Sequence, residues 1–124
     1  MPVCEGGERD LLDLLAMDRH GRLHVLELKT SEHIGFPLQA LDYWSRVRRH
    51  QLAGDFERLG YFPGRMVSPL PPRLCLIAPA LRWHPRTDAI LKWLRPEVPW
   101  LCIGINEEWR RGIQVVYRKE APSV

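Results

Sequence analysis

The chain has 124 residues and a formal net charge of +3, with 45% hydrophobic and 27% charged residues. This length is typical of one domain, and the composition is that of a globular protein rather than a disordered or fibrous one. No apolar run approaches the roughly 20 residues of a membrane span, and residues 1–10 lack the basic and apolar segments of a secretory signal. We therefore expect a single domain over residues 1–124, a cytoplasmic location and no membrane partner.

The cysteines argue against a zinc site. Cys4, Cys75 and Cys102 are widely spaced and form no CxxC pair. Cys75 and Cys102 lie inside apolar runs, where we expect them to be small buried hydrophobic residues. Unpaired cysteines of this kind fit a reducing compartment.

Two short apolar runs, residues 11–17 and 22–29, predict a β-hairpin. Asp18 and Gly21 between them suit a type I turn followed by a left-handed glycine. With residues 19–21 as the loop, Asp18 pairs with Arg22, and Asp13 falls directly opposite Glu27. The leucines of both runs also favour helix, but the tight turn and the short runs favour strands.

The rest of the chain alternates helices and buried strands. We expect a helix from about residue 37 to 50, a break or second short helix near 55–59, and a loop over 60–72. A strand at 73–79, a helix at 85–94 that packs through residues such as Trp93, and strands at 100–105 and 113–117 complete the order β-β-α-β-α-β-β. Apolar strands alternating with helices predict an α/β fold in which helices cover a central sheet.

Asp13, Glu27 and Lys29 are charged residues inside the two most apolar strands. Glu27 and Lys29 are two residues apart on one strand and therefore share a face, which Asp13 joins as the partner of Glu27. Two carboxylates this close are costly unless a cation compensates them, and their oxygens suit Mg²⁺ or Mn²⁺. The alternative is a plain cross-strand ion pair of Lys29 with an acid, in an unrelated fold.

This ordered set resembles the PD-(D/E)xK, or restriction-endonuclease-like, nuclease superfamily. Asp13 on one strand, Glu27-Leu28-Lys29 on the next and a helix with Gln39 and Tyr43 match its D, ExK and QxxxY motifs. The resemblance implies a mixed sheet flanked by helices and Mg²⁺- or Mn²⁺-dependent hydrolysis of DNA phosphodiester bonds. It also implies that Asp13 and Glu27 bind the metal, with the Leu28 carbonyl as a third ligand. Lys29 would be the catalytic lysine, and Gln39 and Tyr43 would line the site.

The start of the chain departs from the superfamily pattern. A helix and a strand usually precede the aspartate-bearing strand, whereas only twelve residues precede Asp13. We therefore expect the chain to be the C-terminal part of a longer protein, or a homodimer in which a second copy completes the layer. A further alternative is a catalytically inactive module that binds DNA or assembles with other proteins.

The helix at 37–50 has two sides. Its apolar stripe comprises Ala40, Leu41, Trp44 and Val47, and a separate, semi-polar strip comprises Gln39, Tyr43, Arg46 and His50. The basic segment of this helix suits a phosphate backbone, because arginine binds phosphate through two hydrogen bonds. The candidate DNA-binding residues are Arg46, Arg48, Arg49 and His50. The alternative for them is a solvated helix face.

Overall fold

The computed structural model describes residues 11–29, 36–82, 87–94 and 97–121. Its elements in chain order are β1 (Leu11–Met17), β2 (Leu23–Lys29), α1 (Phe36–Leu52), α2 (Asp55–Arg58), β3 (Arg73–Pro79), the 3-10 turn η1 (Ala80–Arg82), α3 (Thr87–Leu91), β4 (Trp100–Ile105) and β5 (Val115–Glu120). The predicted α/β class and the predicted order of strands and main helices are confirmed.

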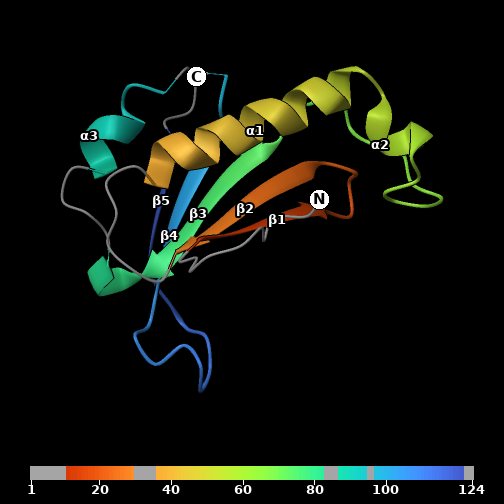
Figure 1. The fold of residues 1–124 in the computed structure, drawn as a ribbon. Coiled ribbons are helices and arrows are strands. Elements are labelled where there is room, and N and C mark those ends of the chain that lie inside the picture. Colours follow the sequence, from red (N-terminus) through yellow and green to blue (C-terminus); the bar gives the residue numbers. More distant parts are fainter. Residues whose placement is uncertain (1–10, 30–35, 83–86, 95–96, 122–124) are drawn as a thin grey trace.

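The strands form a five-stranded mixed sheet in the order β1-β2-β3-β4-β5. β1 and β2 pair antiparallel, β2, β3 and β4 run parallel, and β5 returns antiparallel to β4. α1 forms the crossover from β2 to β3 and lies diagonally across the sheet (Figure 1). Parallel neighbours require such a crossover, because a tight turn joins only antiparallel strands.

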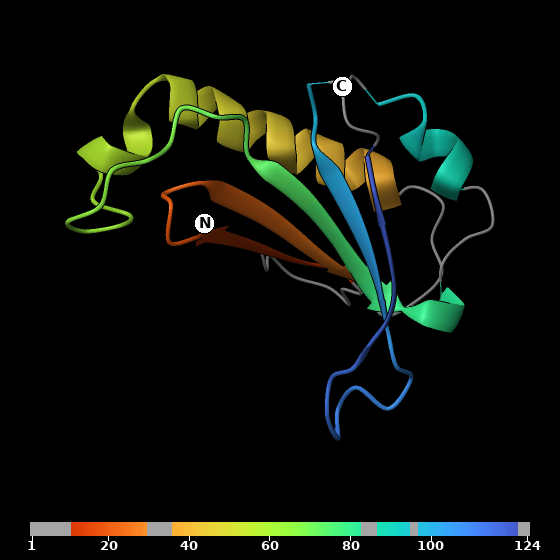
Figure 2. The ribbon, with the colours of Figure 1, turned by 180° about the vertical axis from the view of Figure 1, so that it is seen from behind.

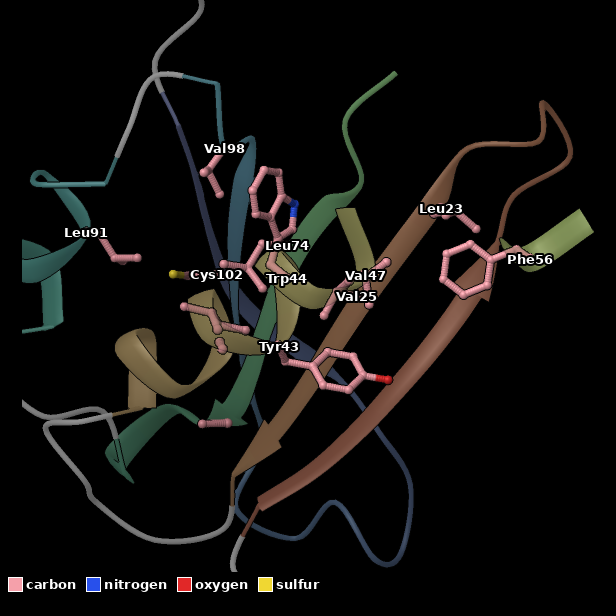
Figure 3. Packing of buried hydrophobic residues seen from close by; sticks show 13 residues of the cluster. Leu23, Val25, Tyr43, Trp44, Val47, Phe56, Leu74, Leu91, Val98 and Cys102 are labelled. Atoms are coloured by element: carbon pink, nitrogen blue, oxygen red, sulfur yellow. The ribbon is translucent and has the colours of Figure 1, made fainter. Parts of the chain in front are cut away.

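The core lies between α1 and one face of the sheet (Figure 3). Its residues from α1 and the central strands include Ala40, Tyr43, Trp44, Val47, Leu23, Val25, Leu74 and Leu76. Phe56 of α2 and Leu91 of α3 belong to the same cluster, so all three helices pack on this face. The Trp44 Nε1 atom donates a hydrogen bond of 2.6 Å to the Pro72 carbonyl, which joins α1 to the segment leading into β3.

No helix of the described residues crosses the opposite face of the sheet (Figure 2). That face is nevertheless apolar at its centre. There Cys75 is buried, Leu14 is 44% exposed, and Leu26, Leu28, Ile77, Leu101 and Ile103 are partly buried. The same face carries the polar residues His24 and Arg73, which pair across β2 and β3, and Arg118 and Glu120 on β5. Helices cover one face of the sheet in the described chain, and we refer to the other as the open face.

Two predicted elements differ most from the structure in their bounds. The last strand was expected from residue 113 but begins at Val115. The backbone groups just before it form hydrogen bonds with the Asn106 side chain. This side chain donates to the Gly112 carbonyl and accepts from the Gln114 N–H. The helix expected to reach residue 94 ends at Leu91, and Trp93, expected to pack, is 88% exposed.

Candidate active site

The turn between β1 and β2 fixes the register of the hairpin. Asp18 Oδ1 accepts hydrogen bonds from the N–H groups of His20 and Arg22, at 2.8 and 3.1 Å. Gly21 has a φ of 82°, and an added Cβ there would lie 2.5 Å from the Met66 carbonyl oxygen. Only glycine meets both conditions without strain. The three-residue loop is therefore as predicted.

This register places Asp13 directly opposite Glu27, as predicted. The pairing continues across the sheet, where Glu27 faces Leu76 of β3 and Leu76 faces Cys102 of β4. Glu27 thus occupies a row whose next members belong to the hydrophobic core. The side chain of Asp13 lies outside the described part of the structure, so its position is known from the strand register.

Glu27 and Lys29 are both buried on the face covered by α1. Residues of β2 alternate between buried and partly buried, and Leu23, Val25, Glu27 and Lys29 are the buried ones. Glu27 is 1% exposed and Lys29 is 2% exposed. Both side chains have a polar or electrostatic interaction, although within the described residues the Glu27 Oε2 atom is buried and accepts no hydrogen bond. A carboxylate and an ammonium group therefore lie inside a largely apolar layer.

Tyr43 belongs to the core rather than to a solvated flank of the helix. It is 8% exposed, and its hydroxyl points toward the hairpin of β1 and β2 (Figure 3). The prediction that Tyr43 lies apart from the apolar stripe is wrong, because α1 is rotated so that Tyr43 faces the sheet beside Ala40 and Val47. Gln39, one turn earlier, is exposed. The structure thus brings Tyr43 into the same layer as Glu27 and Lys29 but leaves Gln39 at its surface.

The four candidate DNA-binding residues have different surroundings. Arg46 forms an exposed ion pair with Asp42, at 2.7 Å. Arg48 donates to Gln51 Oε1 and to the Pro69 carbonyl. His50 lies 2.7 Å from Asp55, whose pKa is held below its usual range by hydrogen bonds from Arg58 and from His50.

Arg49, the fourth candidate, is exposed and forms no hydrogen bond or ion pair with a described residue. Sequence reasoning missed Arg19 and Arg65, which the fold brings to the same end of the molecule. Arg65 donates to the carbonyl of Asp18, across 47 positions of sequence. No local pattern carries such information.

The residues available to a metal ion are oxygen donors. Among the described side chains, no group of three or more His, Cys, Asp and Glu residues comes together. The expected donors are therefore the Glu27 carboxylate, the carboxylate of Asp13 as its register partner, and the main-chain carbonyl of Leu28 on the same strand. Such hard donors fit Mg²⁺ or Mn²⁺ completed by water and phosphate oxygens.

Comparisons with protein families, curated proteins and solved structures complete the description of this site. None of the three finds a match for the chain. Among the described residues, no helix has the length and apolar character needed to cross a membrane.

Proposed function

We propose that the chain is a restriction-endonuclease-like nuclease that hydrolyses DNA phosphodiester bonds with Mg²⁺ or Mn²⁺. The observation that carries the proposal is the almost complete burial of Glu27 and Lys29 on one face of β2, with Asp13 as the register partner of Glu27. Burying charged groups costs free energy, and a fold without a use for them gains more from apolar residues there.

The donor set of this site matches the chemistry of phosphodiester hydrolysis. Asp13, Glu27 and the Leu28 carbonyl would hold the metal ion. When bound, the ion polarises the phosphoryl oxygen and lowers the pKa of the attacking water. Phosphate oxygens complete the coordination of Mg²⁺ in many such sites, so a phosphate group of the substrate would supply ligands that the protein does not.

Lys29 and Tyr43 give the site its other functions. The Lys29 ammonium shares the face of Glu27, where it can position the attacking water and stabilise negative charge that develops on the phosphorus centre. Tyr43 presents a hydroxyl between α1 and the hairpin, suited to donate a hydrogen bond to a phosphate oxygen or to water (Figure 3). Gln39, exposed one turn earlier on α1, would contact a substrate backbone that approaches from solvent.

Cleavage assays test the proposal. Wild-type protein is incubated with linear, circular and branched DNA in Mn²⁺ or Mg²⁺, beside Lys29→Ala and the control Lys92→Ala, which removes an exposed ammonium after α3. We expect wild type and Lys92→Ala to cleave, and Lys29→Ala to lose at least about 100-fold in rate, the usual scale for one electrostatic group. A wild-type protein that binds DNA but cleaves none of the substrates would favour the alternative, an inactive DNA-binding or assembly module.

The proposal includes a homodimer formed through the open face. Arg118 and Glu120 are half-exposed or more and lie at its β5 border with opposite charges, 3.6 Å apart. A second copy related by a two-fold axis would cover the apolar side chains and allow Arg118 of each copy to meet Glu120 of the other. Light scattering at tens of micromolar protein should give twice the chain mass of 14.5 kDa. A mass of one chain would exclude this dimer without bearing on cleavage.

A further inference from the structure

One end of the molecule is assembled from segments far apart in the sequence. The Ser68 N–H donates to the Gly21 carbonyl, which joins the β1–β2 turn to the loop before β3. Gln51, in the last turn of α1, donates to the carbonyls of Ser68 and Leu70. The turn, the end of α1, α2 and residues 60–72 therefore form one unit at the end of α1 where α2 follows (Figure 1).

Arginines gather in this unit, and several are held by neutral groups. Arg22 donates through Nε and Nη2 to the Pro71 carbonyl, Arg48 donates to the Pro69 carbonyl, and Arg65 donates to the Asp18 carbonyl. A carbonyl fixes a guanidinium group without cancelling its charge. These arginines are therefore oriented and remain positively charged toward an anionic partner.

Arg19 and Arg49 add exposed charge beside them. Both are exposed, and neither forms a hydrogen bond or an ion pair with a described residue. The acids of this end, Asp18, Asp55 and the exposed Glu57, leave a net positive charge, because six arginines lie among them: Arg19, Arg22, Arg48, Arg49, Arg58 and Arg65. Asp18 is occupied by His24 and by backbone N–H groups, and Asp55 by His50 and Arg58. We call Arg19, Arg48, Arg49 and Arg65 the basic tip; Arg48 is partly buried and the other three are exposed.

The basic tip lies at a defined distance from the proposed active site. β2 begins at Leu23, beside the turn, and has 7 residues, ending at Lys29. At about 3.3 Å per residue, the strand spans about 20 Å. Duplex DNA rises 3.4 Å per base pair along each strand, so this distance corresponds to about six base pairs.

We propose that the basic tip binds the phosphate backbone of duplex DNA about six base pairs from the phosphate that enters the active site. The inference rests on the proposed nuclease function and extends it to a second contact with the substrate. Guanidinium groups bind phosphate through paired hydrogen bonds, and groups already oriented by carbonyls lose less freedom on binding. The exposed flank of α1, with Gln39 and Arg46, runs between the two contacts.

Apolar side chains at the same end define the competing partner. Met66 is 85% exposed and Leu52 is 71% exposed. Arginine beside exposed apolar residues also suits an anionic membrane surface. We favour DNA because the tip and the buried Glu27 and Lys29 lie at opposite ends of one strand, so a single extended polyanion can reach both.

The test measures DNA affinity in EDTA, where no cleavage occurs, by fluorescence anisotropy with labelled hairpin duplexes of increasing length. The variants are Arg19→Ala/Arg49→Ala and a control with the same loss of charge, Lys92→Ala/Arg111→Ala, at exposed positions away from the tip. The logarithm of the affinity constant falls as the logarithm of the salt concentration rises, and each lost phosphate contact makes this negative slope shallower by about 0.9. Between about 50 and 200 mM salt, wild type and control should therefore lose roughly tenfold more affinity than the tip variant.

Three results would overturn the inference. An unchanged salt slope in the tip variant, with wild type binding DNA, rejects the tip and leaves the nuclease function standing. Binding of wild type to phosphatidylserine vesicles through Arg19 and Arg49, with no effect of these residues on duplex affinity, assigns the tip to a membrane surface. A wild type that neither binds duplex nor cleaves it in Mn²⁺ rejects the nuclease function, and the inference with it.

Discussion

Replacing Glu27 with glutamine distinguishes the stability that metal binding adds from the stability of the metal-free fold. The substitution keeps the shape of a side chain that is 1% exposed and removes its charge. Without metal, two effects oppose one another. Repulsion between directly paired carboxylates about 5 Å apart is about 3 kcal/mol at an effective dielectric constant of about 20, and its removal stabilises the fold. Attraction to Lys29, two residues along the strand at about 6.6 Å, is about 2.5 kcal/mol, and its loss destabilises it.

The metal-free variant should therefore melt close to wild type. Unfolding entropy of about 2.1 cal/mol/K per residue over 124 residues makes 1 kcal/mol equivalent to about 4 °C. With metal, the difference is large. Mn²⁺ at about 100 times its dissociation constant stabilises the folded state by about 2.7 kcal/mol, or roughly 10 °C. Glu27→Gln should lose this shift.

Thermal unfolding with increasing Mn²⁺ or Mg²⁺, followed by circular dichroism, measures the effect. Glu108→Gln is the matched control, because Glu108 is exposed in the β4–β5 loop and should leave the shift unchanged. A Glu27→Gln protein that keeps the full metal-dependent shift would remove Glu27 from the site. No shift in the wild-type protein with either cation would refute the reasoning from paired carboxylates altogether.

Three further predictions concern other parts of the fold. Gly104→Ala should lower the melting temperature by about 4–12 °C, because the new Cβ overlaps the Tyr117 ring on β5 and overpacking costs about 1–3 kcal/mol; the loss should shrink in a Tyr117→Ala background. Hydrogen bonds from His24 and backbone N–H groups lower the pKa of Asp18 in the folded chain, so its stabilisation holds above the unfolded pKa near 3.8 and declines as the pH falls below it. Asp18→Asn should flatten the acid limb of the stability profile; an unchanged limb would contradict this role. Burial raises the pKa of the Cys75 thiol to about 11, so native protein at pH 8 should resist alkylation there and react in denaturant, as peptide mass spectrometry would show.

Local interactions explain why the hairpin could be predicted from the sequence. Asp18 and Gly21 set the loop length through contacts within a few residues, and the loop length sets the pairing of Asp13 with Glu27. The burial of Glu27 and Lys29 follows from the alternation of the strand once its inner face is known. These features depend on short-range geometry, which a sequence displays directly.

Features that depend on how helices and strands pack against each other could not be predicted from the sequence. The periodicity of α1 is compatible with several rotations about its axis, and only packing against β2 and β3 decides that Tyr43 faces inward while Gln39 stays exposed. Trp93 lies beyond the end of α3, at a position that the pattern alone assigned to the helix. The basic tip depends on contacts such as that of Arg65 with Asp18, which no local pattern encodes.

The sequential order of the strands also bears on how the chain folds. Each strand pairs with the one before it in the sequence, so every new strand adds to an edge that already exists. The β1–β2 hairpin closes a short loop, whereas the parallel pairing of β2 with β3 must wait for residues 30–72, and such long-range pairing forms slowly. The hairpin that carries Asp13, Glu27 and Lys29 precedes α1 and the other described strands in the sequence. The pairing of Asp13 with Glu27 depends only on the turn at residues 18–22, so this register can be set before β3, β4 or β5 is synthesised.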